Sequence, residues 1–204
     1  MHFKVYRENK KTKTEIMIKI ALFGSGNGTN AQRICEYFAG RADVEVACIV
    51  YNKKGAYIAE RAKKLGIEAL YYGRETFYGS EEVVREMQER GVDYIVLAGF
   101  LWLVPKNLLE AYPRKIVNIH PALLPKYGGK GMYGAHVHEA VIAHGEKESG
   151  ITIHIVDDRY DEGTTIFQAR CEVSQEDTPE SLAAKIHKLE YAHYAETIDR
   201  WIHQ

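Results

Sequence analysis

The sequence predicts an α/β fold with a doubly wound, mostly parallel sheet, an antiparallel strand pair in the C-terminal part and a long C-terminal helix. Three observations support this prediction. Short apolar runs alternate with helical segments through residue 120, which is typical of βαβ units. The apolar runs 149–158 and 164–173 are joined by five residues, too few for a crossover helix, so we expect them to pair antiparallel. Apolar residues then recur at helical spacing across 178–202.

The first part of the chain should form five buried strands separated by helices. Each strand is a short apolar run bounded by glycine or polar residues, at 17–24, 44–52, 67–72, 92–100 and 115–120. Helices are expected at 28–40, 55–66, 80–91 and 105–112. Ser80 should be the N-cap of the third helix, and Pro105 should lie in the first turn of the fourth. Gly66 should end the second helix.

The second part should contain a helix at 133–145, the antiparallel strand pair and the final helix. Thr178 is the expected N-cap of the final helix, with Pro179 at its first position. A capping box requires an acid or amide three residues after the cap, and Ser181 stands there, so we expect an incomplete box. The face that should be buried comprises Leu182, Ile186, Leu189, Tyr194, Ile198 and Trp201.

The bulk composition is that of a globular protein, and we expect residues 1–204 to form a single domain. Of the 204 residues, 46% are hydrophobic, and 27 basic residues balance 28 acidic ones. The net charge of −1 gives no broad attraction to nucleic acid or to a membrane surface, so we expect small-molecule substrates. No segment reaches the ~20 apolar residues of a membrane span.

The three cysteines indicate a reducing, cytoplasmic location. Cys35, Cys48 and Cys171 are odd in number, lie far apart and form no CxxC or Cys/His metal spacing. We expect each of them to be a small buried hydrophobic residue. His136 and His138 stand two residues apart on a predicted helix and cannot share a face, so no metal is expected there.

Residues 1–16 precede the first predicted strand and should lie outside the core. They are basic, lack the apolar stretch of a signal peptide, and show no helical or strand pattern after residue 6. Met17 stands directly before the first strand. We expect a dispensable extension, and a chain started at Met17 that lost stability or activity would contradict this expectation.

A glycine-rich loop, "GSGNGTNAQ" at 24–32, follows the first predicted strand. Backbone N–H groups at a helix N-terminus attract anions, and glycines let a phosphate approach the backbone. The GxGxxG dinucleotide motif fails because Thr29 replaces its third glycine, and the second strand ends without an acid for a ribose, so no nicotinamide cofactor is expected. Gly28, Thr29 and Asn30 are the expected donors to a single phosphate. The alternative is a purely structural turn.

The fifth predicted strand ends in two polar residues, Asn118 and His120, before a proline-bounded loop. Residues two apart in a strand point to the same side, so both can face one reacting atom. An Asn amide can donate to a developing oxyanion, and a His can pass a proton near neutral pH. Asp161, in the turn after the next strand, is the best-placed carboxylate to orient the His. The alternative is a strand end with a structural role only.

Together these motifs resemble the phosphoribosylglycinamide formyltransferase family of folate-dependent enzymes over about residues 17–202. The segments "GSGNGTNAQ", "LAGFLWLVP", "VNIHPALLPKY", "ITIHIVDDRYDEGTTI" and "KIHKLEYAHYAETI" occur in the order seen in that family. The resemblance implies transfer of the formyl group of 10-formyltetrahydrofolate to the amine of 5-phosphoribosylglycinamide in purine biosynthesis, through a tetrahedral oxyanion. A monomer or a homodimer is expected, with no metal.

The resemblance also implies a role for individual residues. Asn118 would bind the oxyanion, His120 would donate a proton, and Asp161 would keep His120 protonated and help to move the proton of the amine. The ribonucleotide would contact Gly28, Thr29, Asn30, Pro121 and Glu190. The folate would contact Arg74, Leu101, Trp102, Leu103, Val104, Asn118, Val156 and Asp161. Residues 17–120 would form a Rossmann-like half, and residues 121–204 a folate and catalytic half.

Two departures from the family pattern leave questions open. Trp102 stands where the family often has Arg, and "KYGGKGMYGAHVH" is longer than the common version, which leaves the contacts of residues 126–138 undefined. Arg74 could also be a solvated surface residue. The family often has a cis peptide bond at the position of Leu124–Pro125. The alternatives are another formyltransferase or hydrolase that uses 10-formyltetrahydrofolate, or a non-catalytic nucleotide-binding module.

Overall fold

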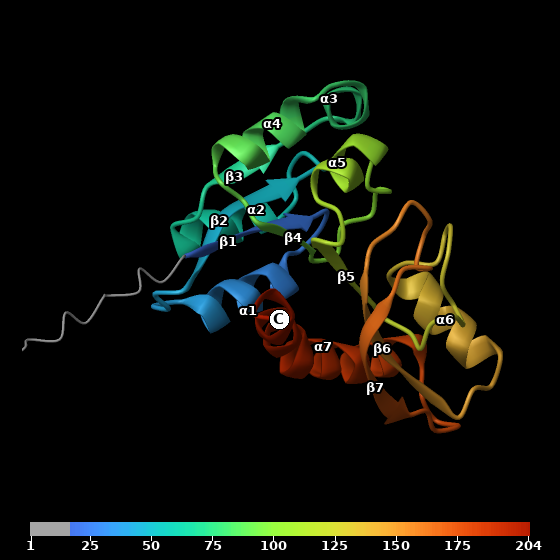
Figure 1. The fold of residues 1–204 in the computed structure, drawn as a ribbon. Helices are drawn as coiled ribbons and strands as arrows, with labels where there is room; N and C mark the ends of the chain where they lie inside the picture. The colour runs from blue at the N-terminus through green and yellow to red at the C-terminus, as the bar shows by residue number, and fades with distance from the viewer. Residues whose placement is uncertain (1–16) are drawn as a thin grey trace, which may run out of the picture.

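The computed structural model describes residues 17–204, and the prediction for residues 1–16 lies outside the described residues. A seven-stranded sheet with the order β3-β2-β1-β4-β5-β6-β7 runs through the molecule (Figure 1). β1 to β5 are parallel, whereas β6 is antiparallel to β5 and β7 is antiparallel to β6. The predicted fold class is confirmed. The strands are β1 (Ile18–Gly24), β2 (Val44–Tyr51), β3 (Ala69–Tyr71), β4 (Tyr94–Leu97), β5 (Ile116–His120), β6 (Glu148–Ile155) and β7 (Thr165–Glu172).

Helices cover both faces of the sheet. Figure 1 shows α3, α4 and α5 on one side and α1 and α7 on the other. The helix α2 packs with α1 on the side of α7. The helices are α1 (Thr29–Phe38), α2 (Ile58–Leu65), α3 (Arg74–Gly79), α4 (Glu82–Glu89), α5 (Lys106–Ala111), α6 (Ala135–Ala143) and α7 (Pro179–Ile202). None of the helices in residues 17–204 is long and apolar enough to cross a membrane.

The alternation of side chains along β1 explains why its sequence is apolar throughout. Ile20 and Leu22 belong to the apolar cluster on the side of α1 and α7, and Ala21 and Phe23 to the cluster on the side of α3, α4 and α5. All four side chains are completely buried. A parallel strand covered by helices on both faces has no solvent-facing side, so a continuous apolar run is favourable. Because β1, β4 and β5 are parallel, their carboxyl ends meet at one edge of the sheet.

Several local predictions need correction. The helix α3 (Arg74–Gly79) lies outside the predicted helices, because only Phe77 in it is buried and its sequence carries no apolar periodicity. The helix α4 begins at Glu82, so Ser80 is not its N-cap, although the Ser80 hydroxyl accepts a hydrogen bond from the Glu82 N–H at 3.3 Å. Pro105 is extended and precedes α5 instead of lying in its first turn. The strands β3 and β4 contain three and four residues, fewer than predicted.

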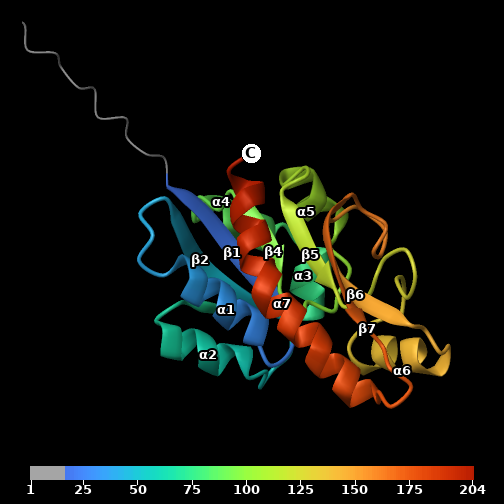
Figure 2. The same cartoon turned by 90° about the horizontal axis from the view of Figure 1, so that it is seen from below.

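The predicted N-cap of α7 is confirmed, but the prediction of an incomplete capping box is wrong. The Thr178 hydroxyl accepts a hydrogen bond from the Ser181 N–H at 3.2 Å, and the Ser181 hydroxyl accepts one from the Thr178 N–H at 3.0 Å. A serine hydroxyl thus replaces the acid or amide of the usual box. The predicted buried face is largely confirmed, with Leu189 only partly buried. Figure 2 shows α7 lying across the molecule from α1 to the region of α6, β6 and β7.

Candidate active site

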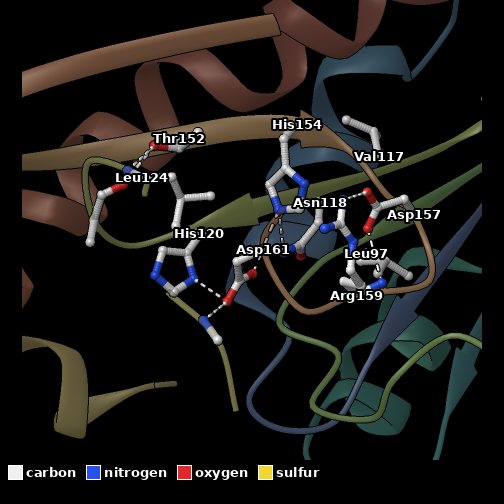
Figure 3. Close-up of polar contacts among 12 residues, drawn as sticks. Leu97, Val117, Asn118, His120, Leu124, Thr152, His154, Asp157, Arg159 and Asp161 are labelled. Carbon is white, nitrogen blue, oxygen red and sulfur yellow. Dashed lines mark hydrogen bonds and ion pairs between the residues drawn. The ribbon is translucent and has the colours of Figure 1, made fainter. Parts of the chain in front are cut away.

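A cavity of about 360 Å³ opens at the carboxyl ends of β4 and β5, the edge where ligands bind in open α/β sheets. Figure 3 shows its polar side, with Asn118 and His120 from β5, His154 from β6 and Asp161 from the loop after β6. The remaining walls come from the segment that follows β4, from the Lys130 region and from the loop after β6. These walls comprise Leu97, Gly99, Phe100, Leu101, Trp102, Leu103, Val104, Ile119, Gly129, Lys130, Gly131, Met132, Tyr133, Val156, Arg159 and Tyr160.

The structure brings the three predicted reaction-centre residues together. Asn118 and His120 stand two apart in β5, and both line the cavity. His120 is 3% exposed, its Nδ1 lies 3.5 Å from Asp161 Oδ2, and its Nε2 donates to the carbonyl of Tyr127 at 2.7 Å. The Nδ2 atom of Asn118 lies 3.2 Å from Nε2 of His154.

The position of Asp161 depends on backbone geometry that only a few residues allow. Asp161 has φ 58°, and its Oδ2 accepts a hydrogen bond from the Gly129 N–H at 2.9 Å. A Cβ atom on Gly128 would lie 2.6 Å from Leu124 Cδ2 and 3.1 Å from Asp161 Cβ. Glycine at position 128 therefore lets the two loops approach closely enough for the carboxylate to reach His120. The peptide bond between Leu124 and Pro125, in the loop after β5, is cis.

Burial and charge act in opposite directions on the pKa values of His120 and Asp161. Burial lowers the pKa of His120, while the carboxylate of Asp161 favours the charged ring. Burial alone would raise the pKa of Asp161, but the hydrogen bond to His154, the charge of His120 and the Gly129 N–H hold that pKa below its ordinary value. The balance leaves the pKa of His120 below its ordinary value, so near neutral pH the site holds an ionised carboxylate beside a His that is mostly neutral and readily gives up an Nδ1 proton once it has gained one. Such a pair can both supply and accept a proton.

His154 is a cavity residue that the sequence interpretation missed. In the register of β5 and β6 it stands opposite Asn118, and its Nε2 also lies 3.6 Å from Asp161 Oδ1. Unprotonated, this nitrogen accepts a hydrogen bond from the Asn118 amide; protonated, it donates to Asp161. Thr152, opposite His120, donates to the carbonyl of Ala122 at 2.7 Å and so holds the start of the loop after β5. The available signal was two polar residues at i and i+2 in the apolar run "ITIHI".

The glycine loop has the predicted form of an open helix N-terminus. Gly28 has φ 77°, and a Cβ atom there would lie 2.6 Å from Ile58 Cγ1, so a larger residue would be strained and crowded. The helix α1 begins at Thr29, and no side chain caps it. Asn30 Nδ2 donates to Glu190 Oε2 at 3.1 Å, and His187 Nδ1 lies 2.8 Å from the same oxygen. Two predicted ribonucleotide contacts, Asn30 and Glu190, are thus in direct contact.

The predicted folate contacts are brought together only in part. Leu101, Trp102, Leu103, Val104 and Val156 line the cavity, together with Asn118 and Asp161. Arg74 lies outside the cavity lining; its guanidinium stacks over the rings of Tyr78 at 5.0 Å and Trp102 at 5.7 Å. Pro121 directly follows His120 and is partly buried without lining the cavity. Arg74 therefore supports an aromatic wall instead of facing the cavity itself.

The cysteines follow the predicted pattern in two cases of three. Cys35 and Cys48 are buried, and burial raises the pKa of each thiol to about 12. Cys171 is only partly buried, because β7 forms the edge of the sheet. His138 is buried and His136 is exposed, as their spacing on one helix requires. In the described part of the chain, no three His, Cys, Asp or Glu residues are grouped so as to hold a metal ion.

The fold and the site define a doubly wound α/β protein with an Asn, two His and an Asp gathered at the carboxyl edge of its sheet. The chain belongs to the formyl transferase family, which it matches over residues 18–198. This match confirms the resemblance inferred from the motifs.

The relatives and structures that it resembles carry consistent names. It is 41% identical over 186 residues to the chloroplastic phosphoribosylglycinamide formyltransferase of Arabidopsis thaliana, a match that covers 88% of this chain and 64% of that protein. It is 35% identical to the phosphoribosylglycinamide formyltransferase of Haemophilus influenzae, covering 87% of this chain and 84% of that one. The crystal structure of the enzyme of that name from Bacillus halodurans superposes with a TM-score of 0.81 at 38% identity, covering 90% of this chain and 95% of the other. The chain spans only 64% and 60% of the length of the Arabidopsis and Vigna unguiculata relatives.

Proposed function

We propose that this protein transfers the formyl group of 10-formyltetrahydrofolate to the amine of 5-phosphoribosylglycinamide, a step of purine biosynthesis. The observation that carries the proposal is the convergence of Asn118, His120 and Asp161 on one cavity at the carboxyl edge of the sheet. The names of relatives that share more than a third of their residues with this chain support the same reaction. If the end of β5 had a structural role only, it would not need the carboxylate of Asp161, a residue with a left-handed backbone conformation, beside His120.

The proposed mechanism assigns one task to each polar side chain. As the amine of the ribonucleotide attacks the formyl carbon, the Asn118 amide donates a hydrogen bond to the oxygen that becomes negative. The Nδ1–H of His120 supplies a proton to the intermediate, and Asp161 stabilises the charged ring. The bond between the formyl carbon and the folate nitrogen then breaks. The proton lost by the attacking amine replaces the one that leaves with tetrahydrofolate, and Asp161 assists this transfer.

The two substrates are proposed to bind on opposite sides of these residues. The N–H groups at the start of α1, at Gly28, Thr29 and Asn30, hold the phosphate, and Glu190 contacts the ribonucleotide. The flat pterin fits the cavity because residues 101–104 form neither helix nor strand, so their peptide groups are not used in a helix or a sheet. The Leu101 N–H donates to Ser25 Oγ and the Leu103 carbonyl accepts from the Tyr78 hydroxyl, so the other peptide groups of this segment would bind the ring edges. In this proposal residues 17–120 supply the phosphate site and residues 121–204 supply most of the catalytic groups.

We also propose the location and the assembly of the protein. The chemistry above requires only a cytoplasmic protein, a monomer or a homodimer, that acts on small molecules without a metal or nucleic acid. The names of the two plant relatives place those proteins in chloroplasts, so location differs within the family.

The test measures the absorbance change as 10-formyl-5,8-dideazafolate loses its formyl group, with and without 5-phosphoribosylglycinamide. Turnover that requires the amine supports the proposal. Formate release without the amine, and no transfer to it, would identify a hydrolase instead. Binding of the ribonucleotide with no turnover under either condition would identify a non-catalytic module.

A pair of His variants tests the site within the same assay. His120→Ala should lower kcat by at least about a hundredfold, the scale of general acid catalysis. His193→Ala is the matched control, because His193 lies on α7, packs against Phe167 of β7 and does not line the cavity. Near-normal kcat in His120→Ala would end its assignment as the proton donor.

A further inference from the structure

The carbonyl of Tyr127 determines which nitrogen of His120 takes part in proton transfer. It lies 2.7 Å from Nε2, and a carbonyl oxygen can only accept a hydrogen bond, so Nε2 carries a proton in both charge states of the ring. The proton that His120 gains or loses is therefore the one on Nδ1. Nδ1 lies 3.5 Å from Asp161 Oδ2, where both residues line the cavity.

The Tyr127 backbone needs support from its surroundings to hold that carbonyl. Tyr127 has φ 57°, a left-handed conformation that an aromatic residue seldom adopts unless other contacts impose it. Its hydroxyl donates to Glu146 Oε1 at 2.9 Å, and its ring packs edge-on against the ring of His144 at 5.7 Å. Glu146 follows α6 and also accepts a hydrogen bond from Lys126 Nζ at 2.8 Å. The hydroxyl of Tyr127 is thus anchored by Glu146, while its backbone carbonyl is bound to His120 Nε2.

The charged and titratable groups that face His120 come from elements other than the Tyr127 loop. Asp161, from the loop after β6, favours the charged ring, whereas His154 on β6 and His138 on α6 disfavour it. Replacing Tyr127 by Phe changes none of these charges. An effect of that replacement on His120 must therefore act through the position of the carbonyl.

We propose that Glu146 and Tyr127 form a positioning relay for His120. Glu146 holds the Tyr127 hydroxyl, the Tyr127 carbonyl holds the Nε2 proton and the plane of the ring, and Nδ1 is left to serve the reacting atoms beside Asp161. Glu146 and Tyr127 are positioning residues, because they act on the reaction only through His120. The relay rests on the proposed function only in taking His120 as the proton donor.

The direct test is the tautomer of His120, read from 15N and 1H NMR of the full chain labelled at histidine nitrogens. In the wild type, neutral His120 should carry its proton on Nε2. In Tyr127→Phe and Glu146→Ala, a fraction should carry it on Nδ1, because Asp161 accepts that proton once the carbonyl is displaced. The same two variants should lose about tenfold in kcat, with KM for both substrates within about twofold, and the titration midpoint of His120 should move.

Two further variants separate the relay from a general loosening of the loop. Glu146→Gln keeps an acceptor oxygen for the Tyr127 hydroxyl and should restore the wild-type tautomer and kcat. Lys126→Met removes the other partner of Glu146 at a side chain that is 65% exposed, and should also match the wild type. Thermal unfolding of each variant checks that the chain remains folded.

An unchanged tautomer and titration midpoint in Tyr127→Phe and Glu146→Ala would overturn the relay. Equal losses in all four variants would overturn it as well, because they would indicate loop stability as the cause. The tautomer is measured without substrates, so it stands apart from the proposed function. A relay seen by NMR in a wild type that transfers no formyl group would refute the function and leave the relay intact.

Discussion

Replacing Asp161 by Asn should make His120 harder to protonate. The change removes a negative charge 3.5 Å from Nδ1 while keeping the size of the side chain and an oxygen that can accept the Gly129 N–H. Because the charge favours the imidazolium, its loss must move the titration midpoint of His120 to lower pH, in the direction in which burial already acts. The wild-type carboxylate is ionised near neutral pH, so the full effect should be present there.

The size of this effect follows from the distance between the two atoms. Two unit charges 3.5 Å apart interact with roughly 5 kcal/mol at an effective dielectric constant of about 20. Water at the cavity mouth screens part of this energy. If only about 1.4 kcal/mol remained, the ratio of imidazolium to imidazole at a fixed pH would still fall tenfold. We therefore expect at least a tenfold fall in that ratio and a comparable loss in kcat.

The assay is an NMR titration of the His120 ring in the wild type and in Asp161→Asn, followed by kcat as a function of pH. Asp158→Asn is the matched control, because its side chain lies in the same loop and is 82% exposed. It should titrate like the wild type. A His120 midpoint that stays in place or moves to higher pH in Asp161→Asn would refute the electrostatic coupling.

Three other changes test other parts of the structure. Trp102→Ala removes an aromatic side chain from the cavity wall, so KM for the formyl folate should rise about tenfold with little change in kcat; an unchanged KM would exclude this wall as a folate contact. Gly128→Ala places a Cβ atom 3.1 Å from that of Asp161 and should displace the carboxylate from His120. We expect kcat to fall about tenfold while the Tm of the protein stays unchanged. Arg41→Met removes a 2.7 Å ion pair to Asp199 and should lower the Tm by a few degrees at neutral pH. Burial acts to raise the pKa of Asp199, but Arg41, with Tyr37 and His203, holds that pKa below its ordinary value. The stabilisation by Arg41 therefore exists above the unfolded pKa and is lost on acidification, and the Tm difference between wild type and variant should shrink below about pH 4.

The parts of the fold that depend on local pattern were predictable. The apolar runs, the helical spacing and the short join between the last two strands indicated every strand and the antiparallel pairing of β6 with β7, whereas the antiparallel pairing of β5 with β6 was not predicted. The positions of Asn118 and His120 on one side of β5 followed from the period of a strand. The helix α3 was not predicted, because a six-residue helix with one buried side chain shows no apolar periodicity in its sequence.

The rest of the site depends on register and on loops, which local pattern does not encode. His154 reaches Asn118 because the two stand opposite each other across β5 and β6, and a shift of one residue would turn the His to the other face. Tyr127 reaches His120 through a left-handed backbone that its own sequence disfavours. Asn30 was expected to serve a phosphate, and its side chain instead donates to Glu190, leaving its backbone N–H for that role.

The long helix α7 limits how the molecule can move. Its 24 residues extend over about 36 Å, and it packs against α1 at one end of the sheet and against α6, β6 and β7 at the other. Elements before and after residue 120 are thus joined by one continuous helix as well as by a shared sheet. This connection disfavours a hinge motion of the part before residue 120 relative to the part after it. Any change in the width of the cavity would therefore have to come from the loops around Gly129 and Asp161, which line it.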